Sequence, residues 1–129
     1  MKRRIFYHDT DCGGVVYYGN YLKFLEEARG ECLEDFGFSV KQLMDEGVWF
    51  VVKRQEIDYK YPAFYDDMLD IKTWIKEMSD FRIQFAYEIK NQSGRLLVKA
   101  ITDMVAVGKD LKMMEMPEKL KTSLKVQCQ

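Results

Sequence analysis

The sequence has few of the residues that metal sites and disulfide frameworks need. Its 129 residues include one histidine, His8, and three cysteines. Cys12, Cys32 and Cys128 are odd in number and widely spaced, which fits neither a disulfide framework nor a paired-cysteine zinc site. A single histidine excludes a multi-histidine metal centre and any mechanism that needs two imidazoles. We therefore expect no metal site and a chemistry based on carboxylates and backbone groups.

An excess of one charge and a long apolar run are also missing. Lys and Arg number 20 and Asp and Glu 21, which argues against a general nucleic-acid binder. No apolar run approaches the roughly 20 residues of a membrane-spanning helix. The first residues are basic, but no apolar stretch separates them from Asp9, so we expect no secretory signal and a cytoplasmic location.

Two prolines and no linker-like segment predict a single domain over residues 1–129. Apolar residues at helical spacing predict a long helix with Asn20 as its N-cap and Gly37 as its C-cap. Alternating patterns predict strands over residues 5–7, 49–53, 57–61, 69–76, 83–89 and 96–107, with short helical segments over 40–46 and 120–129. Short connections favour antiparallel neighbours. We expect an α+β domain in which an antiparallel sheet packs around one long helix and leaves its edges for a partner.

The chemistry-bearing segment is the loop before the long helix, where residues 9–14 read Asp-Thr-Asp-Cys-Gly-Gly. Gly13 and Gly14 allow a ligand to approach the main chain closely. Amides at a helix N-terminus suit a developing oxyanion, and an aspartate beside them can attack an acyl carbon or activate water. The alternative interpretation is a turn whose aspartates bond their own backbone.

Residues 9–17, followed by Asn20-Tyr21 and the pattern over residues 24–29, resemble the opening signature of the hot-dog-fold acyl-CoA thioesterases. The branch is the one that contains 4-hydroxybenzoyl-CoA thioesterase and the Tol-Pal-linked bacterial enzymes. Residues 61–67 resemble the second recognisable segment of that branch. A looser likeness extends to residues 112–117, so the resemblance covers nearly the whole chain.

The resemblance implies a hot-dog fold and hydrolysis of an acyl-CoA thioester to free acid and CoA. It assigns catalysis to Asp11, as nucleophile or general base, and polarisation of the carbonyl to the backbone amide of Tyr18, where the Tol-Pal-linked enzymes often have histidine. It also implies a homo-oligomer, a dimer or dimer of dimers, that binds CoA across a subunit interface with no separate cofactor. Further residues expected to line the substrate site are Gly13, Gly14, Val16, Tyr17 and Asn20.

Other polar residues have both a functional and a structural interpretation. Asp9 either stabilises the turn or raises the pKa of Asp11. His8 is interpreted as a solvated residue at the end of a strand, and Cys12 as a small loop residue, in preference to a catalytic role for either. Candidates for the CoA phosphates, each also readable as a solvated charge, are Arg54, Lys60, Arg82 and Lys112. The paired arginines of the hydroxybenzoyl enzyme are missing around residues 78–81, so CoA anchoring is expected to differ. The sequence does not identify the acyl group of the substrate. Two alternative functions also stay open: an acyl-carrier-protein thioesterase and a non-catalytic acyl-CoA-binding module.

Overall fold

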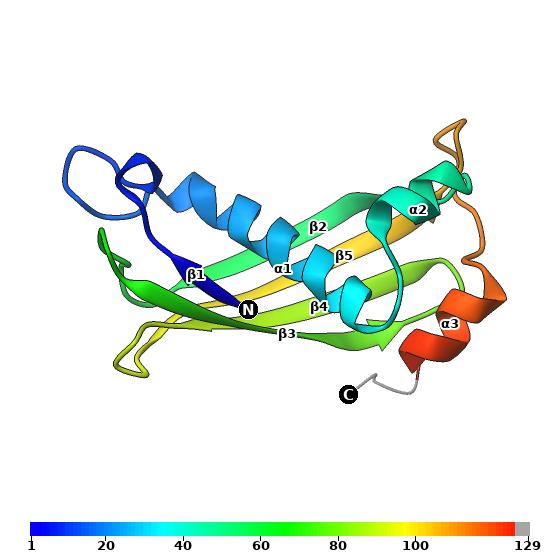
Figure 1. The fold of residues 1–129 in the computed structure, drawn as a ribbon. Coiled ribbons are helices and arrows are strands. Elements are labelled where there is room, and N and C mark those ends of the chain that lie inside the picture. Colours follow the sequence, from blue (N-terminus) through cyan, green and yellow to red (C-terminus); the bar gives the residue numbers. More distant parts are fainter. Residues whose placement is uncertain (126–129) are drawn as a thin grey trace.

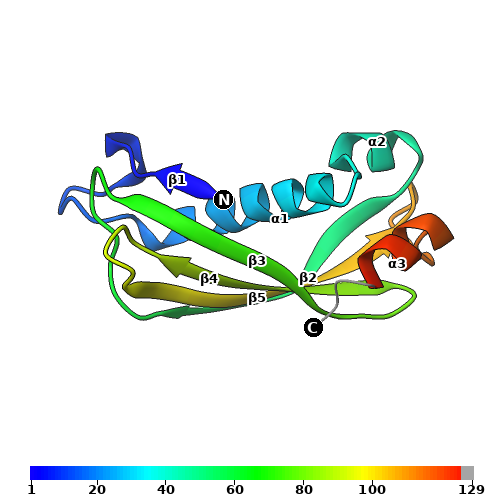
Figure 2. The ribbon, with the colours of Figure 1, turned by 60° about the horizontal axis from the view of Figure 1, so that its bottom comes forward.

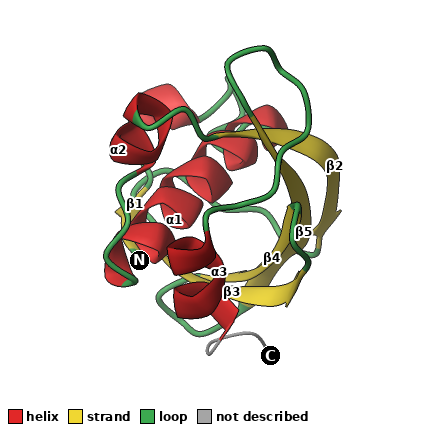
Figure 3. Cartoon of the chain, turned by 90° about the vertical axis from the view of Figure 1, so that its right-hand side faces the viewer, coloured by secondary structure: helices red, strands yellow, loops and turns green. Residues whose placement is uncertain are grey.

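The computed structural model describes residues 1–125 as a curved antiparallel sheet that wraps one long helix (Figures 1 and 3). The sheet order is β1-β3-β4-β5-β2. The helix α1 lies along one face of the sheet, and α2 and α3 both lie at the end of the sheet where α1 ends (Figure 2). In chain order the elements are β1 (Lys2–Arg4), the 3₁₀ turns Tyr7–Asp9 and Tyr18–Asn20, α1 (Tyr21–Asp35), α2 (Val40–Asp45), β2 (Trp49–Tyr59), β3 (Met68–Met78), β4 (Arg82–Lys90), β5 (Leu96–Val107) and α3 (Glu118–Lys125). The predicted α+β architecture is confirmed.

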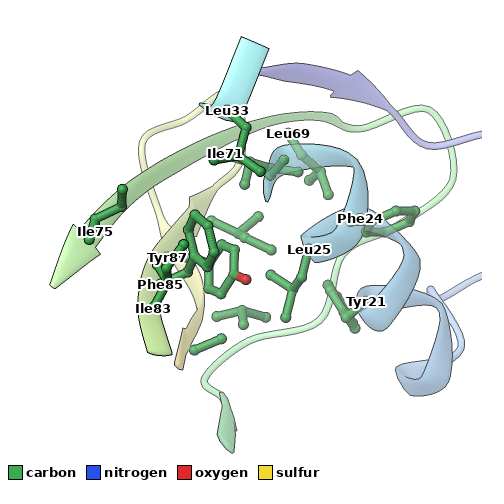
Figure 4. Packing of buried hydrophobic residues seen from close by; sticks show 14 of the residues in the cluster. Tyr21, Phe24, Leu25, Leu33, Leu69, Ile71, Ile75, Ile83, Phe85 and Tyr87 are labelled. Atoms are coloured by element: carbon green, nitrogen blue, oxygen red, sulfur yellow. The ribbon is translucent and has the colours of Figure 1, made fainter. Parts of the chain in front are cut away.

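The core lies between α1 and the inner face of the sheet (Figure 4). Leu25 points from the helix toward the strands, and Tyr21, Phe24 and Leu25 are all at most 3% exposed. The alternation predicted for β3 and β4 is what buries one face of each strand. The buried strand residues on this face include Leu69, Ile71, Ile75, Ile83, Phe85, Tyr87 and Ile89.

The C-terminal end of α1 is confirmed, and Asn20 is the N-cap residue by position, as predicted, although its side chain does not cap the helix. Gly37 has φ of +90°, and the Phe38 amide donates to the Leu33 carbonyl over 3.0 Å, a glycine-dependent Schellman end. At the start, Asn20 has helical backbone angles and its side chain makes no cap. The amide Nδ2 of Asn20 instead donates to the Asp9 carbonyl over 2.8 Å, because a 3₁₀ turn precedes the helix.

The first strand lies earlier than predicted. β1 comprises Lys2–Arg4 and pairs with β3, whereas residues 7–9 of the sequence form a 3₁₀ turn. The carboxylate of Asp9 accepts the Phe6 amide over 2.9 Å, and the Thr10 amide donates to the Tyr7 carbonyl over 3.0 Å. These local bonds bend the chain away from the sheet, so the apolar run at residues 5–7 does not continue as a strand.

The two strands predicted over residues 49–53 and 57–61 are one strand, β2. Its pairing with β5 shifts register between Val52 and Arg54, which marks a β-bulge. A bulge adds one residue to the strand, so the side chains that follow it point to the opposite face of the sheet from the one that the alternation predicts. The period-two pattern therefore breaks at Lys53 although the strand continues. β2 is also the edge of the sheet, paired on one side only within the described residues.

At the C-terminal end, the helix predicted over residues 120–129 is present as α3, which buries Leu120 and Leu124. Residues 126–129, with Cys128, lie outside the described residues. None of the helices within residues 1–125 is long and apolar enough to cross a membrane.

Candidate active site

The loop over residues 10–16 is closed on itself and tied to a distant segment. Thr10 and Val16 form an antiparallel bridge, and the Asp11 amide donates to the Val15 carbonyl over 2.9 Å. Val15 forms a second bridge to Phe64, and the Tyr65 amide donates to the Gly14 carbonyl over 3.1 Å. The structure thus places the two segments singled out in the sequence, residues 9–17 and 61–67, side by side.

Asp11 stands exposed at the tip of this loop with one carboxylate oxygen anchored. Its Oδ1 accepts the Gly13 amide over 2.8 Å, and Gly14 has φ of +79°, a conformation that favours glycine. A Cβ on Gly13 would lie 3.3 Å from Asp11 Oδ1, so glycine leaves room for that contact. Within residues 1–125 no hydrogen bond reaches Oδ2 of Asp11. The turn that the structural interpretation predicts is present, and it holds the carboxylate with one oxygen free.

The backbone amide of Tyr18 begins the 3₁₀ turn that leads into α1. First-turn amides have no acceptor inside their own helix, and the positive end of the α1 dipole lies behind them. No backbone acceptor for this amide is found among residues 1–125. The carbonyl of Tyr18 accepts the Tyr59 hydroxyl over 3.2 Å, which fixes the orientation of the turn. The turn therefore presents an oriented, unmatched donor.

Glycine at position 19 lets the Tyr17 ring lie against this turn. A Cβ on Gly19 would lie 2.6 Å from Cε2 of Tyr17, so a larger residue would displace that half-exposed ring. The Tyr17 ring lies over the turn and 4.8 Å from the Tyr18 ring, centroid to centroid. The rings of Tyr17, Tyr18 and Tyr59 are each about half exposed or more, so they form an aromatic rim beside the Tyr18 amide.

Asp9 is the anchor that joins these parts. It is 5% exposed, and its Oδ2 accepts both the Arg3 guanidinium, over 2.7 Å, and the Phe6 amide. Its carbonyl accepts the Tyr17 amide over 3.2 Å and the Asn20 side chain. Asp11 is two residues beyond Asp9, and Tyr18 is one residue beyond Tyr17, so both candidate groups are held through the same contact. Asp9 therefore has the structural role.

The electrostatics of Asp9 agree with that role. Burial raises the pKa of its carboxyl, but the Phe6 amide, the Arg3 guanidinium and His8 together lower the pKa below the usual value of an aspartate. The Arg3 side chain, only 19% exposed, also lies over the Phe24 ring with its Cζ 4.5 Å from the ring centre. Arg3 carries no motif signal, because its partners come together only in the folded chain.

The remaining predicted residues lie in different settings. Val16 is buried in the core, His8 is exposed and stacks on the Phe6 ring, and Cys12 is exposed beside Asp11. Among residues 1–125 no group of three His, Cys, Asp or Glu side chains is arranged to hold a metal ion.

The four candidates for the CoA phosphates lie on different elements of the protomer. Arg54 pairs with Glu56 in the middle of β2, and Arg82 lies 3.9 Å from Glu77 at the start of β4. Lys112 lies in the turn after β5. Lys60 follows Tyr59, whose hydroxyl donates to the Tyr18 carbonyl. The sequence analysis missed Arg95, whose Cζ lies 3.5 Å from the centre of the Tyr61 ring.

A groove of about 1100 Å³ opens elsewhere, between α1, α2 and the first half of β2. Apolar side chains of three strands form its floor, and charged residues of α1 form its rim. Neither Asp11 nor Tyr18 lines it. Its lining includes Glu26, Gly30, Val40, Met44, Phe50 and Val52.

Residues 7–124 match the thioesterase-like superfamily, which covers more than half of the chain. The chain belongs to this superfamily. The match contains the whole Asp11 loop, α1 and the sheet except β1. The family, the hot-dog fold class and the predicted class of enzyme, a thioester hydrolase, are thereby confirmed.

Proteins similar to this chain are named as thioesterases or thioester hydrolases. The acyl-CoA thioester hydrolase YbgC of Escherichia coli O157:H7 is 43% identical over 104 residues, 81% of this chain and 78% of that protein. The acyl-CoA thioesterase YbgC of Haemophilus influenzae is 37% identical over 123 residues, 93% of this chain and 89% of that protein. Among solved structures, a DHNA-CoA thioesterase from Staphylococcus aureus superposes with a TM-score of 0.92 at 26% identity, covering 98% of this chain and 89% of that one.

Proposed function

We propose that this protein hydrolyses acyl-CoA thioesters, with the thioester carbonyl held at the Tyr18 amide and Asp11 acting beside it. The observation that supports this is the pairing on one loop of a carboxylate with a free oxygen and an unmatched backbone donor, both held through Asp9. A module that only binds acyl-CoA has no need of a carboxylate next to the electrophilic carbon. The named relatives support the acyl-CoA class.

In this mechanism the Tyr18 amide donates to the carbonyl oxygen as negative charge develops on it, and the α1 dipole adds to that stabilisation. Asp11 then acts in one of two ways. As a general base it takes a proton from water while the water oxygen bonds to the carbonyl carbon; as a nucleophile it bonds to that carbon itself, and water cleaves the resulting anhydride. In both routes the C–S bond breaks, and the sulfur leaves as the CoA thiol with a proton.

Substrate contacts follow from the same placement. Gly13 and Gly14 carry no side chains that would keep the ligand from the main chain, and Tyr17 lies beside the Tyr18 amide. Lys60, together with Arg95, supplies positive charge at this end of the molecule for a CoA phosphate. Arg54, Arg82 and Lys112 stay candidates for a site that a second subunit completes. The predicted cytoplasmic location and the absence of a cofactor also stay predictions.

The direct test is thiol release from acetyl-, hexanoyl-, dodecanoyl- and benzoyl-CoA, with each acyl group also supplied on acyl carrier protein. We expect turnover of at least one CoA ester at a rate well above hydrolysis in buffer. A clear preference for the carrier-bound forms would favour the carrier-protein alternative. Tight binding of acyl-CoA without thiol release would favour the non-catalytic module and contradict the proposal.

We further propose that the active form is a homodimer joined through β2. This edge strand is 11 residues long and contains no proline, so its outer edge can pair with another strand. Its charges are divided: Lys53 and Arg54 precede Gln55, and Glu56 and Asp58 follow it. Antiparallel self-pairing about Gln55 sets Arg54 of each copy opposite Glu56 of the other, whereas parallel pairing in register would oppose like charges. Assembly into a dimer of dimers stays a prediction.

Reversing one of these charges is expected to weaken the dimer. Glu56→Arg places like charges opposite each other twice in a symmetric interface, so we expect the dimer dissociation constant to rise at least about tenfold at low salt. The double variant Arg54→Glu with Glu56→Arg restores opposite charges and is the matched control that recovers association. Analytical ultracentrifugation over a concentration series measures both. A wild type that is monomeric at 100-fold the enzyme's assay concentration would contradict pairing through β2.

A further inference from the structure

The amide expected to hold the thioester carbonyl belongs to a turn with little support of its own. No side chain caps the start of the 3₁₀ turn at Tyr17, and the bonds of a 3₁₀ turn have poorer geometry than those of an α-helix. Inside the turn, the Asn20 amide donates to the Tyr17 carbonyl over 2.9 Å, and the Tyr21 amide is shared between the carbonyls of Tyr18 and Gly19. The direction of the Tyr18 N–H bond therefore depends on contacts from outside the turn.

Contacts from elsewhere hold the turn on both sides of this amide. Before it, the Asp9 carbonyl accepts the Tyr17 amide over 3.2 Å. After it, the Tyr59 hydroxyl donates to the Tyr18 carbonyl over 3.2 Å. Each peptide unit is planar, so the backbone angles of Tyr17 and Tyr18 set the direction of the Tyr18 N–H bond. Holding the peptide unit before this bond and the one after it restricts those angles.

Tyr59 is suited to this task because it is fixed in the sheet. It is the last residue of β2 and pairs with β5, and the next amide, that of Lys60, donates to the Leu97 carbonyl over 2.7 Å. Its ring packs edge-on against the buried Tyr21 ring, with the centroids 5.5 Å apart. Burial and the nearby Tyr18 raise the pKa of the Tyr59 phenol, so it stays protonated and able to donate at neutral pH. A group on a rigid strand holds its partner more exactly than a group on a loop.

We propose that Tyr59 is a positioning residue for thioester hydrolysis: its hydroxyl holds the Tyr18 carbonyl and so keeps the Tyr18 amide directed at the developing oxyanion. The inference rests on the proposed function and goes beyond it, because it gives a role in the reaction to a residue 41 positions away in the chain. Tyr59 acts through the backbone of Tyr18 and not on the substrate. A small displacement of an oxyanion donor lowers the rate, so loss of the hydroxyl slows the chemical step and leaves substrate binding unchanged.

The test is Tyr59→Phe, assayed by thiol release with the best CoA ester of the wild type. Phenylalanine keeps the ring that packs against Tyr21 and removes only the donor, so we expect kcat to fall about tenfold and KM to stay within about twofold. The loss of one half-exposed hydrogen bond should lower Tm by no more than about 4 °C. Tyr65→Phe is the matched control: it removes the same atom from an exposed ring, on a segment whose backbone contacts the catalytic loop, and keeps the wild-type kcat.

A second measurement reads the direction of the amide without turnover. The residual dipolar coupling of the Tyr18 N–H bond, measured by NMR on isotope-labelled protein, depends on the angle between that bond and the alignment axes. We expect this coupling to change in Tyr59→Phe, while the couplings of residues in the middle of α1 stay as in the wild type. In Tyr65→Phe the Tyr18 coupling should keep its wild-type value.

A Tyr59→Phe protein with kcat within twofold of the wild type, or with an unchanged Tyr18 coupling, would overturn the inference and leave the proposed function standing. A rise in KM at unchanged kcat would also overturn it, because Tyr59 would then contact the substrate as part of the aromatic rim. A wild type that hydrolyses no ester in the panel would overturn the proposed function and, with it, the role of Tyr59 in the reaction, whatever the coupling shows.

Discussion

Asp11→Asn is expected to lower kcat at least about 10²-fold with little change in stability. Asparagine keeps the side-chain oxygen that accepts the Gly13 amide over 2.8 Å, so the loop retains its shape. It cannot take a proton from water, and it is a poor nucleophile, so both routes open to Asp11 are lost. The measurement is steady-state thiol release with the best CoA ester of the wild type.

The neighbouring residue offers a matched control for this experiment. Cys12 lies on the same exposed loop, and Cys12→Ser changes one atom without touching the carboxylate. We expect it to keep at least half of the wild-type kcat. An Asp11→Asn protein that also kept half of the wild-type activity would remove Asp11 from the mechanism, and a Cys12→Ser protein that lost activity would move attention to the thiol.

Asp9→Asn is expected to lower the free energy of unfolding by about 2–4 kcal/mol at pH 7, because it leaves the Arg3 guanidinium partly buried without its carboxylate. The pKa of Asp9 is lowered in the folded protein, by the Phe6 amide, Arg3 and His8 against the opposing effect of burial. Its contribution is therefore fully present above the unfolded pKa of about 3.9 and is lost as the pH falls through the lower, folded value.

Urea unfolding of the wild type and Asp9→Asn between pH 7 and pH 2.5 measures this dependence. The difference in unfolding free energy should be constant near neutral pH and shrink only in the acid range, below about pH 4. Asp11→Asn, on the same loop but exposed, serves as the control with little loss of stability at any pH. A difference between wild type and Asp9→Asn that stayed the same down to pH 2.5 would show that charge on Asp9 does not stabilise the fold.

The parts of the fold that could be predicted are those that local patterns specify. The helix end at Gly37 follows from one residue that tolerates positive φ, and β5 follows from a long uninterrupted strand pattern. The errors arose where particular bonds override the apolar pattern. The bulge in the pairing of β2 with β5 interrupts the alternation after Val52, and the local bond from the Phe6 amide to the Asp9 carboxylate accompanies a 3₁₀ turn at residues 7–9 that ends the expected strand at residues 5–7.

The candidate site shows the same division. Asp11, the glycines and the helix start are neighbours in the chain, so their pattern could be read as a loop with catalytic chemistry. Arg3, Tyr59 and Arg95 could not be found that way. Tyr59 and Arg95 come from distant parts of the chain and contact the Tyr18 carbonyl and the Tyr61 ring, whereas Arg3 reaches the Asp9 carboxylate from β1.

By itself, the sequence determined the family, the helix-and-sheet architecture and the loop that carries Asp11, because each depends on periodicity or on residues close together in the chain. Only the tertiary structure decided how Asp9 and Arg3 hold that loop, that β2 is a charged edge strand with no strand on its outer side among residues 1–125, and that a groove opens between α1, α2 and β2. Those features join residues from separate elements, and the relative position of such residues exists only once the sheet has closed around α1.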